Sequence, residues 1–323
     1  MKKNTINTSI TIAGVTFKNP IIAASGTFGF GREYSKLYDI STLGGFCTKG
    51  LTVEPREGNA PPRIAETYMG ILNSVGLQNP GIDAFVRDEL PFLSRLDTIR
   101  IANVAGNTKE EYIEIVKRVS QASLSHCEER NDEAISRKKP IDMIELNISC
   151  PNVAAGGMSF GVCPTSVESI VSAVRPYAKL PMIVKLTPNV ANIAENARAA
   201  ENAGADAISL INTIAGMAVN YKTRKPILAR GFGGLSGPAV KPIALKMTHD
   251  CYKAVKIPII GMGGITTAED IMEFMLCGAT AVQIGTANFS NPNICFSLVK
   301  DLTNILKECN INDVREVIGA LEA

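Results

Sequence analysis

The sequence predicts a single (β/α)8 barrel, on three observations. Eight short apolar runs recur along the chain, and each has the length and composition of a buried parallel strand. Helical patterns separate most of these runs, and strand–helix alternation of this kind builds a parallel sheet. The 323 residues exceed the roughly 250 that such a barrel needs. Eight units in one chain favour a closed barrel over an open, doubly wound sheet.

The elements are expected at definite places. The eight strands are expected at residues 20–25, 45–49, 99–105, 141–149, 182–186, 207–212, 257–261 and 281–285. Helices are expected at residues 109–121, 167–177, 192–203, 240–255 and 268–277, with a final pair after Pro292. Residues 8–19 alternate around Ala13-Gly14, which predicts a hairpin that closes the floor of the barrel.

Three stretches interrupt this alternation. Residues 50–95 and 213–238 are long, irregular excursions that leave the carboxyl ends of expected strands. Long loops in compact domains are usually functional, and barrel enzymes place their active sites at that face. Residues 125–139 carry eight charges in fifteen positions and enter at the opposite face, before the fourth strand. They predict a charged surface insertion in one domain that spans residues 1–323.

Composition excludes several classes of protein. The 33 basic and 31 acidic residues nearly balance, so nothing favours binding to nucleic acid or to an anionic membrane. No apolar run approaches the roughly 18 residues of a membrane span, and no signal-peptide core follows the first lysines. We therefore expect a cytoplasmic protein. Eight cysteines without a CxxC pair, and only two histidines, indicate no metal site, no iron–sulfur cluster and no histidine-based triad.

The residues that carry chemistry gather at strand ends. Cys150 follows the fourth strand in ELNISCPN, between Asn147 and Asn152. A buried loop cap is the structural alternative for this segment, and Asn152 suits a turn as well as a substrate contact. Polar or glycine residues end nearly every other strand: Ser25, Lys49, Asn103, Lys185, Asn212-Thr213, Gly263-Gly264 and Gly285-Thr286. A lysine buried at a strand end needs a partner, so the pattern favours an active site.

Glycines at the ends of the last two strands indicate a phosphate. GMGGI and IGTA leave backbone N–H groups open to a phosphoryl group, and Ser236-Gly237 could supply a third contact. Tight turns that need glycine are the alternative. Barrels that bind many different phosphorylated ligands share this device, so the glycines alone do not identify the ligand.

Several motifs together resemble class 1 dihydroorotate dehydrogenase over essentially the whole chain. They are ELNISCPN, NSVGLQNPG (73–81), ANVAGN (102–107), VKLTPN (184–189), INT (211–213) and GGLSGPAVKPIALK (233–246). Three details resemble the class 1B catalytic subunit: GGMSFG (156–161), VKLTPN and Asn212-Thr213. The fumarate-using class 1A carries Asn-Ser in place of Asn212-Thr213. The charged insertion at residues 125–139 departs from the family pattern.

The resemblance implies an activity and a set of roles. The family oxidises dihydroorotate to orotate in pyrimidine synthesis, with a hydride passed to N5 of FMN, one per chain, and Cys150 as the base. Substrate contacts are implied for Lys49, Asn73, Ser74, Val75, Gly76, Leu77, Asn147, Asn212 and Thr213. FMN contacts are implied for Ser25, Lys49, Gly50, Asn103, Asn147, Lys185, Ile211, Gly237, Gly263, Gly264, Gly285 and Thr286. Lys49 would face the substrate carboxylate, and Lys185 the N1–C2 edge of the flavin.

The resemblance also implies partners. A homodimer of this chain would be flanked by two subunits that carry FAD and a [2Fe–2S] cluster, a heterotetramer that delivers electrons to NAD+. The chain itself has no cluster motif and no G-x-G-x-x-G fingerprint after a strand, which agrees. Three alternatives stay open at this point: a fumarate-dependent class 1A-like enzyme, a pyrimidine-reducing flavin enzyme, and a non-redox phosphate-binding barrel in which Lys185 forms a Schiff base.

Overall fold

Eight parallel strands close into a barrel. The computed structural model describes residues 6–128, 139–149 and 160–322. Each barrel strand pairs with two parallel neighbours, and β16 pairs with β3 to close the ring. In chain order the strands are β3 (Ile21–Ala23), β4 (Gly45–Cys47), β7 (Ile99–Val104), β8 (Met143–Asn147), β9 (Met182–Lys185), β10 (Ala207–Leu210), β15 (Ile259–Met262) and β16 (Ala281–Ile284). All eight expected strands, and with them the (β/α)8 barrel, are confirmed.

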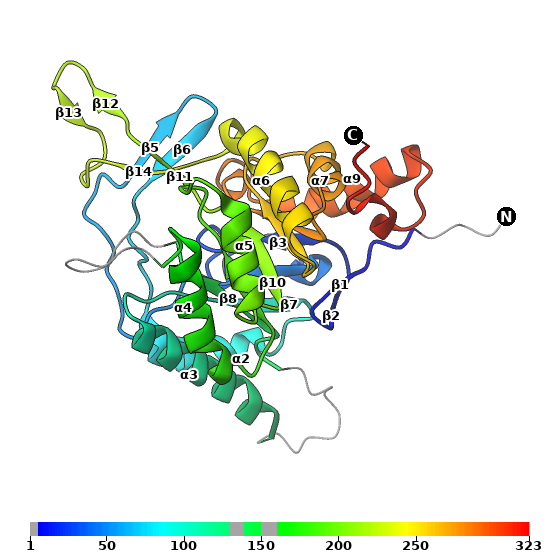
Figure 1. Ribbon diagram of the computed structural model, residues 1–323, viewed down its shortest axis with the longest axis horizontal. Coiled ribbons are helices and arrows are strands. Elements are labelled where there is room, and N and C mark those ends of the chain that lie inside the picture. The colour runs from blue at the N-terminus through cyan, green and yellow to red at the C-terminus, as the bar shows by residue number, and fades with distance from the viewer. Residues whose placement is uncertain (1–5, 129–138, 150–159, 323) are drawn as a thin grey trace.

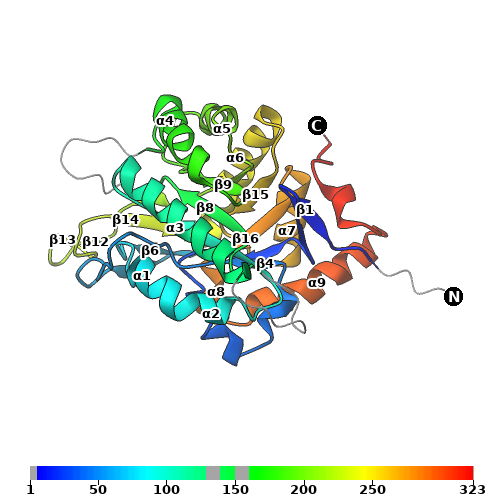
Figure 2. The ribbon, with the colours of Figure 1, turned by 90° about the horizontal axis from the view of Figure 1, so that it is seen from below.

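Helices cover the outside of the barrel, where their apolar faces join one continuous core. In Figure 2, α4, α5 and α6 lie side by side over one flank of the strands. The five internal helices expected from the sequence are present as α3 (Lys109–Glu128), α4 (Pro164–Val174), α5 (Ile193–Asn202), α6 (Lys241–Ala254) and α7 (Ala268–Leu276).

The expected pair of helices after Pro292 was wrong in part. One long helix, α9 (Ile294–Glu308), follows this proline, and the second helical segment is only a 3-10 turn, Val314–Val317. A capping box from Asp313 fixes that turn, and Gly319 with positive φ follows soon after it. A four-residue helix, α8 (Ala287–Ser290), lies before the proline instead.

The N-terminal hairpin is also confirmed. Strands β1 (Ile10–Ile12) and β2 (Val15–Phe17) pair antiparallel, and the turn residues Ala13 and Gly14 both have positive φ. Ile10, Ile12 and Phe17 are fully or almost fully buried and belong to the main core. In Figure 1 the hairpin lies at the opposite end of the molecule from the β12–β13 hairpin.

The two long excursions build a second sheet together. Strands β5 (Ile64–Thr67) and β6 (Gly70–Asn73) come from the first excursion, β11 (Ile214–Gly216) and β14 (Gly233–Ser236) from the second. They form an antiparallel sheet in the order β11-β14-β6-β5, so segments about 160 residues apart pair directly. The second excursion also carries the small β12 (Val219–Asn220) and β13 (Lys225–Pro226) hairpin (Figure 1).

The first excursion holds a helical stretch that the sequence did not reveal. It runs as α1 (Gly81–Ala84), a π-helical turn (Phe85–Glu89) and α2 (Leu90–Leu93). Its apolar side chains face the core, and four of them are buried: Ile82, Phe85, Leu90 and Leu93. This stretch completes the helical unit between β4 and β7.

The expected charged insertion, residues 125–139, overlaps the end of α3. Residues 125–128 form the last turn of α3, and residues 129–138 lie outside the described residues. Helix α3 leads into β8, so the insertion enters at the amino ends of the strands, on the side away from the excursions. None of the helices in residues 6–128, 139–149 and 160–322 has the length and apolar character to cross a membrane.

Candidate active site

One cavity of about 790 Å³ lies at the carboxyl ends of the barrel strands, beneath the sheet of the two excursions. Every described residue for which the sequence predicts a contact contributes to its wall: Ser25, Lys49, Gly50, Asn73, Ser74, Val75, Gly76, Leu77, Asn103, Asn147, Lys185, Ile211, Asn212, Thr213, Gly237, Gly263, Gly264, Gly285 and Thr286. Cys150 and Asn152 lie outside the described residues. The structure thus brings the residues together, while their individual roles stay predictions.

Glycine backbone forms one end of the cavity. Gly237, Gly263 and Gly264 all have positive φ, at 104°, 130° and 79°. A Cβ at Gly264 would lie only 3.0 Å from the carbonyl oxygen of Gly237, so the two chain segments approach as closely as they do because glycine is present. Nearby, Thr286 Oγ1 donates to Ser236 Oγ at 2.8 Å, which ties the last barrel strand to β14.

Amide side chains line another wall. Asn212 Nδ2 donates to Asn147 Oδ1 at 3.3 Å, and the backbone N–H of Thr213 donates to Asn212 Oδ1 at 2.8 Å. Asn189, which the sequence analysis did not single out, holds the same loop through bonds to Thr213 O and Ala215 N. The wall therefore offers fixed amide donors and acceptors, which suit a planar ring with amide-type edges.

Lys49 lies at the cavity without a counter-ion in the described part of the chain. Burial, and then the nearby positive charge of Arg63, lower the pKa of the Lys49 ammonium from its ordinary value. This ammonium favours an anionic ligand, because a carboxylate beside it would offset both the cost of burial and the repulsion from Arg63.

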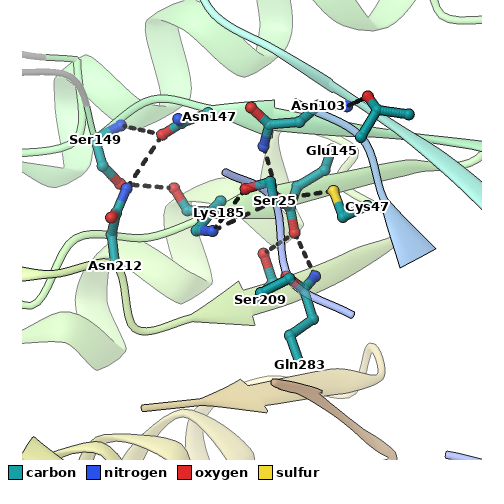
Figure 3. Close-up of polar contacts among 12 residues, drawn as sticks. Ser25, Cys47, Asn103, Glu145, Asn147, Ser149, Lys185, Ser209, Asn212 and Gln283 are labelled. Atoms are coloured by element: carbon teal, nitrogen blue, oxygen red, sulfur yellow. Dashed lines mark hydrogen bonds and ion pairs between the residues drawn. The ribbon is translucent and has the colours of Figure 1, made fainter. Parts of the chain in front are cut away.

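Lys185 is set in a different environment. Its Nζ donates to Ser25 Oγ at 3.3 Å and lies 3.7 Å from Glu145 Oε1. Both side chains are almost inaccessible, with 7% of Lys185 and 0% of Glu145 exposed. Figure 3 shows the Glu145 carboxylate beside Lys185, with neutral donors around it. The two lysines of the cavity therefore differ: one has a buried counter-ion and the other does not.

Sequence reasoning missed the carboxylate of Glu145 and two of its donors, Ser209 and Gln283. A signal was available. Glu145 is a charged residue inside the apolar run 141–149, and its parity along β8 places it on the same face as Asn147. A charge in a buried strand demands partners. Cys47, near the end of β4, is fully buried in the core.

Comparisons with known proteins decide the family. The family model for dihydroorotate dehydrogenase matches residues 7–306. The chain belongs to this family. It is 52% identical over 314 residues to a Caldicellulosiruptor saccharolyticus protein named dihydroorotate dehydrogenase B (NAD(+)), catalytic subunit, with 97% of this chain and 99% of the relative covered. A Bacillus pumilus protein of the same name is 50% identical, with 96% and 95% covered.

A solved structure supports the fold. The dihydroorotate dehydrogenase of Eimeria tenella, in complex with ferulenol, superposes with a TM-score of 0.78 over 99% of this chain and 90% of its own, at 22% identity. At that identity the likeness concerns the barrel alone. The family expected from the motifs is confirmed by the family match and by the relatives.

Proposed function

We propose that this chain is the catalytic subunit of an NAD+-linked dihydroorotate dehydrogenase, which oxidises dihydroorotate to orotate in pyrimidine synthesis. One observation carries the proposal: a single cavity is lined by glycine backbone, by amide side chains and by two lysines, the groups that suit a flavin phosphate, a pyrimidine ring and its carboxylate. The names of its relatives, at about half identity over nearly the full length, support the same activity.

The cavity fits FMN by its volume and by its polar groups. Its volume, about 790 Å³, is within the range of cofactor sites. The Gly237, Gly263 and Gly264 backbone would hold the phosphate, because glycine leaves backbone N–H groups open to a phosphoryl group. When bound, FMN would supply the acceptor for a hydride. Ser25, Asn103 and Lys185 would hold the edges of the flavin ring.

The substrate would lie against the amide wall. Lys49 would pair with its carboxylate, and Asn73, Asn147, Asn212 and Thr213 would bind the amide-type edges of the ring. Oxidation also removes a proton from carbon, which requires a base in contact with the substrate. We assign this role to Cys150, because a thiolate can accept a proton from carbon and the family motif carries cysteine there.

Electrons would leave through a second subunit. The relatives are named as catalytic subunits, which implies a further subunit, and we propose that it carries FAD and a [2Fe–2S] cluster. A homodimer of this chain with two such subunits is the expected assembly. Among the described residues there is no group of three cysteine, histidine or acidic side chains that could hold a metal ion.

The test compares substrates and electron acceptors. We expect the purified chain to be yellow, and its flavin absorption to bleach when dihydroorotate is added without oxygen. Dihydrouracil should leave the flavin oxidised, whereas a pyrimidine-reducing enzyme would react with it. We expect NAD+ reduction only after the partner subunit is added. Rapid turnover with fumarate and the chain alone would overturn the NAD+ assignment, and a colourless protein would overturn the flavin proposal.

A further inference from the structure

Glu145 is the most completely enclosed charged group among the described residues that contact the cavity wall. Its side chain is 0% exposed and lies on β8, inside the barrel. Its Oε1 accepts from Asn103 Nδ2 at 2.7 Å and from Cys47 Sγ at 3.3 Å. Its Oε2 accepts from Gln283 Nε2 at 2.6 Å and from Ser209 Oγ at 2.9 Å. Donors from four other strands thus converge on one carboxylate (Figure 3).

The surroundings keep this carboxylate ionised. Burial alone would raise the pKa of Glu145, but the Lys185 ammonium and the hydrogen bonds from Gln283, Ser209 and Cys47 outweigh it and hold the pKa below its ordinary value. Two of these partners, Asn103 Nδ2 and Gln283 Nε2, can only donate, so they suit an ionised carboxylate better than a neutral acid. The arrangement is therefore built for a negative charge.

The other titratable group in contact with this carboxylate, within residues 6–128, 139–149 and 160–322, is the thiol of Cys47. Burial, and then the negative charge of Glu145, raise the pKa of that thiol well above its ordinary value. Cys47 therefore stays protonated and acts as a donor. The groups that face Lys185 and Glu145 from the other strands are the neutral side chains of Ser25, Asn103, Ser209 and Gln283.

We propose that Glu145 is a positioning residue that keeps Lys185 charged and fixes its ammonium at the floor of the cavity, and thereby sets the reduction potential of the bound flavin. The inference rests on the proposed FMN site. An ammonium that is 7% exposed is costly to bury unless an anion lies beside it, and Glu145 Oε1 lies 3.7 Å away. With Glu145 present, the pair stays ionised, and its positive end faces the cavity.

The consequence for the flavin has a definite sign at each pH. Reduced FMN is an anion when a cation lies near its N1–C2 edge, so positive charge there raises the potential. In Glu145→Gln at low pH, Lys185 is still charged but is no longer neutralised, and the potential lies above that of the native protein. At high pH, Lys185 in the variant is neutral, and the potential lies below the native value. The difference between the two proteins therefore reverses sign as pH rises.

The substitution is compatible with the barrel. Gln283 Oε1 is buried and makes no hydrogen bond in the described part of the chain. If Gln283 turns its amide over, this oxygen accepts from the new amide at position 145, so a neutral side chain of the same size is accommodated. Ser209→Ala is the matched control, because it removes one donor to the same carboxylate and leaves both charges in place.

The experiment measures the potential of bound FMN against reference dyes from about pH 6 to about pH 10, a range that ends near the ordinary lysine pKa. We expect Glu145→Gln to show an inflection and a crossing of the native curve, and Ser209→Ala to run parallel to it. The double variant Glu145→Gln/Lys185→Met should lose the inflection. An inflection that persists in the double variant would assign the titration to another group, such as Cys47, and would overturn the inference.

Other outcomes are equally decisive. A Glu145→Gln curve parallel to the native curve means that Glu145 has only a structural role. If Glu145→Gln does not fold, neutron diffraction on the native crystal at alkaline pH replaces it: we expect three deuterons on Lys185 Nζ and none on Glu145. A neutral amine there contradicts the inference. Native protein that binds no FMN contradicts the proposed function itself, so the two failures are distinguishable.

Discussion

The side chains of Asn147 and Asn212 form a directional pair, in which Asn212 Nδ2 donates to Asn147 Oδ1 at 3.3 Å. The same side-chain oxygen, Asn147 Oδ1, also accepts from the backbone N–H of Ser149 at 3.3 Å. Both contacts use the oxygen of Asn147, so its amide nitrogen makes no hydrogen bond within the described residues and is left to donate to a ligand. The pair thus fixes which end of each amide the cavity presents.

Reversal of this pair should weaken orotate binding. In Asn212→Asp the new carboxylate can only accept, so Asn147 must turn over and present its oxygen to the cavity, beside an added negative charge. Because hydrogen bonds to charged groups contribute about 1.5–3 kcal/mol, we expect the Kd for orotate to rise about 10- to 100-fold. The measurement is the change in flavin absorption on titration with orotate.

The control is Asn192→Asp, the same chemical change at the N-cap of α5, where asparagine and aspartate cap equally well. It should bind orotate as the native protein does. Native-like affinity in Asn212→Asp, with normal FMN content, would show that the amide wall does not bind the substrate.

Lys49 gives a dependence on pH. Its charged form binds the substrate carboxylate, and burial followed by Arg63 lowers the pKa of the free lysine, so the charge is lost at a lower pH than usual. We expect the native affinity for orotate to fall as pH rises through that pKa, towards the affinity of Lys49→Met. At neutral pH, Lys49→Met should bind orotate at least about 10-fold more weakly than the native protein. A variant with the same alkaline decline as the native protein would exclude Lys49 from this role.

The glycine-lined end can be tested at Gly285. A Cβ there would meet Ala24 Cβ at 3.6 Å and Thr27 Cγ2 at 3.8 Å, which are ordinary contacts, so the protein itself has room for alanine. A phosphate against the Gly285 backbone has no such room. We expect Gly285→Ala to unfold at the native temperature without FMN, and to bind FMN about tenfold more weakly or worse, since overpacking costs about 1–3 kcal/mol. Native FMN affinity would place the phosphate elsewhere.

The charged insertion should be dispensable. Deletion of residues 129–138, joined by a short glycine–serine linker between Glu128 and Lys139, leaves α3 and the Ser123–Ile141 contact in place. These residues enter at the face opposite the cavity, so we expect normal FMN content and normal dihydroorotate oxidation. Flavin content is read from absorbance. Loss of bound flavin would contradict the assignment of this segment to the surface.

The barrel could be predicted from sequence because its strands are local patterns. Each is an apolar run short enough to be a strand, and each is followed by a polar or glycine residue at the carboxyl end. Because the carboxyl ends of parallel strands lie at the same face of the barrel, Lys49, Asn103 and Lys185 were expected to lie near one another. The pairing of Asn73 with Gly234 could not be predicted, because it joins two irregular segments whose strands are only three or four residues long.

The helical stretch at residues 81–93 and the role of Glu145 were missed for different physical reasons. Pro91 and the π-helical turn disturb the 3.6-residue period, so the apolar spacing gave no clear helical pattern. The alternation of side chains along a strand predicts which way Glu145 points, but not what it contacts. Only the closed barrel brings its partners from three other strands together: Cys47, Ser209 and Gln283.

We propose that dihydroorotate reduces a flavin in this cavity with Cys150 as the base. The most direct measurement follows flavin absorption in a stopped-flow instrument, without oxygen, after native protein or Cys150→Ala is mixed with dihydroorotate. A general base contributes about 10²- to 10⁴-fold to rate, so we expect rapid bleaching in the native protein and a rate at least about 100-fold lower in the variant. Bleaching at the same rate in both proteins would contradict the claim.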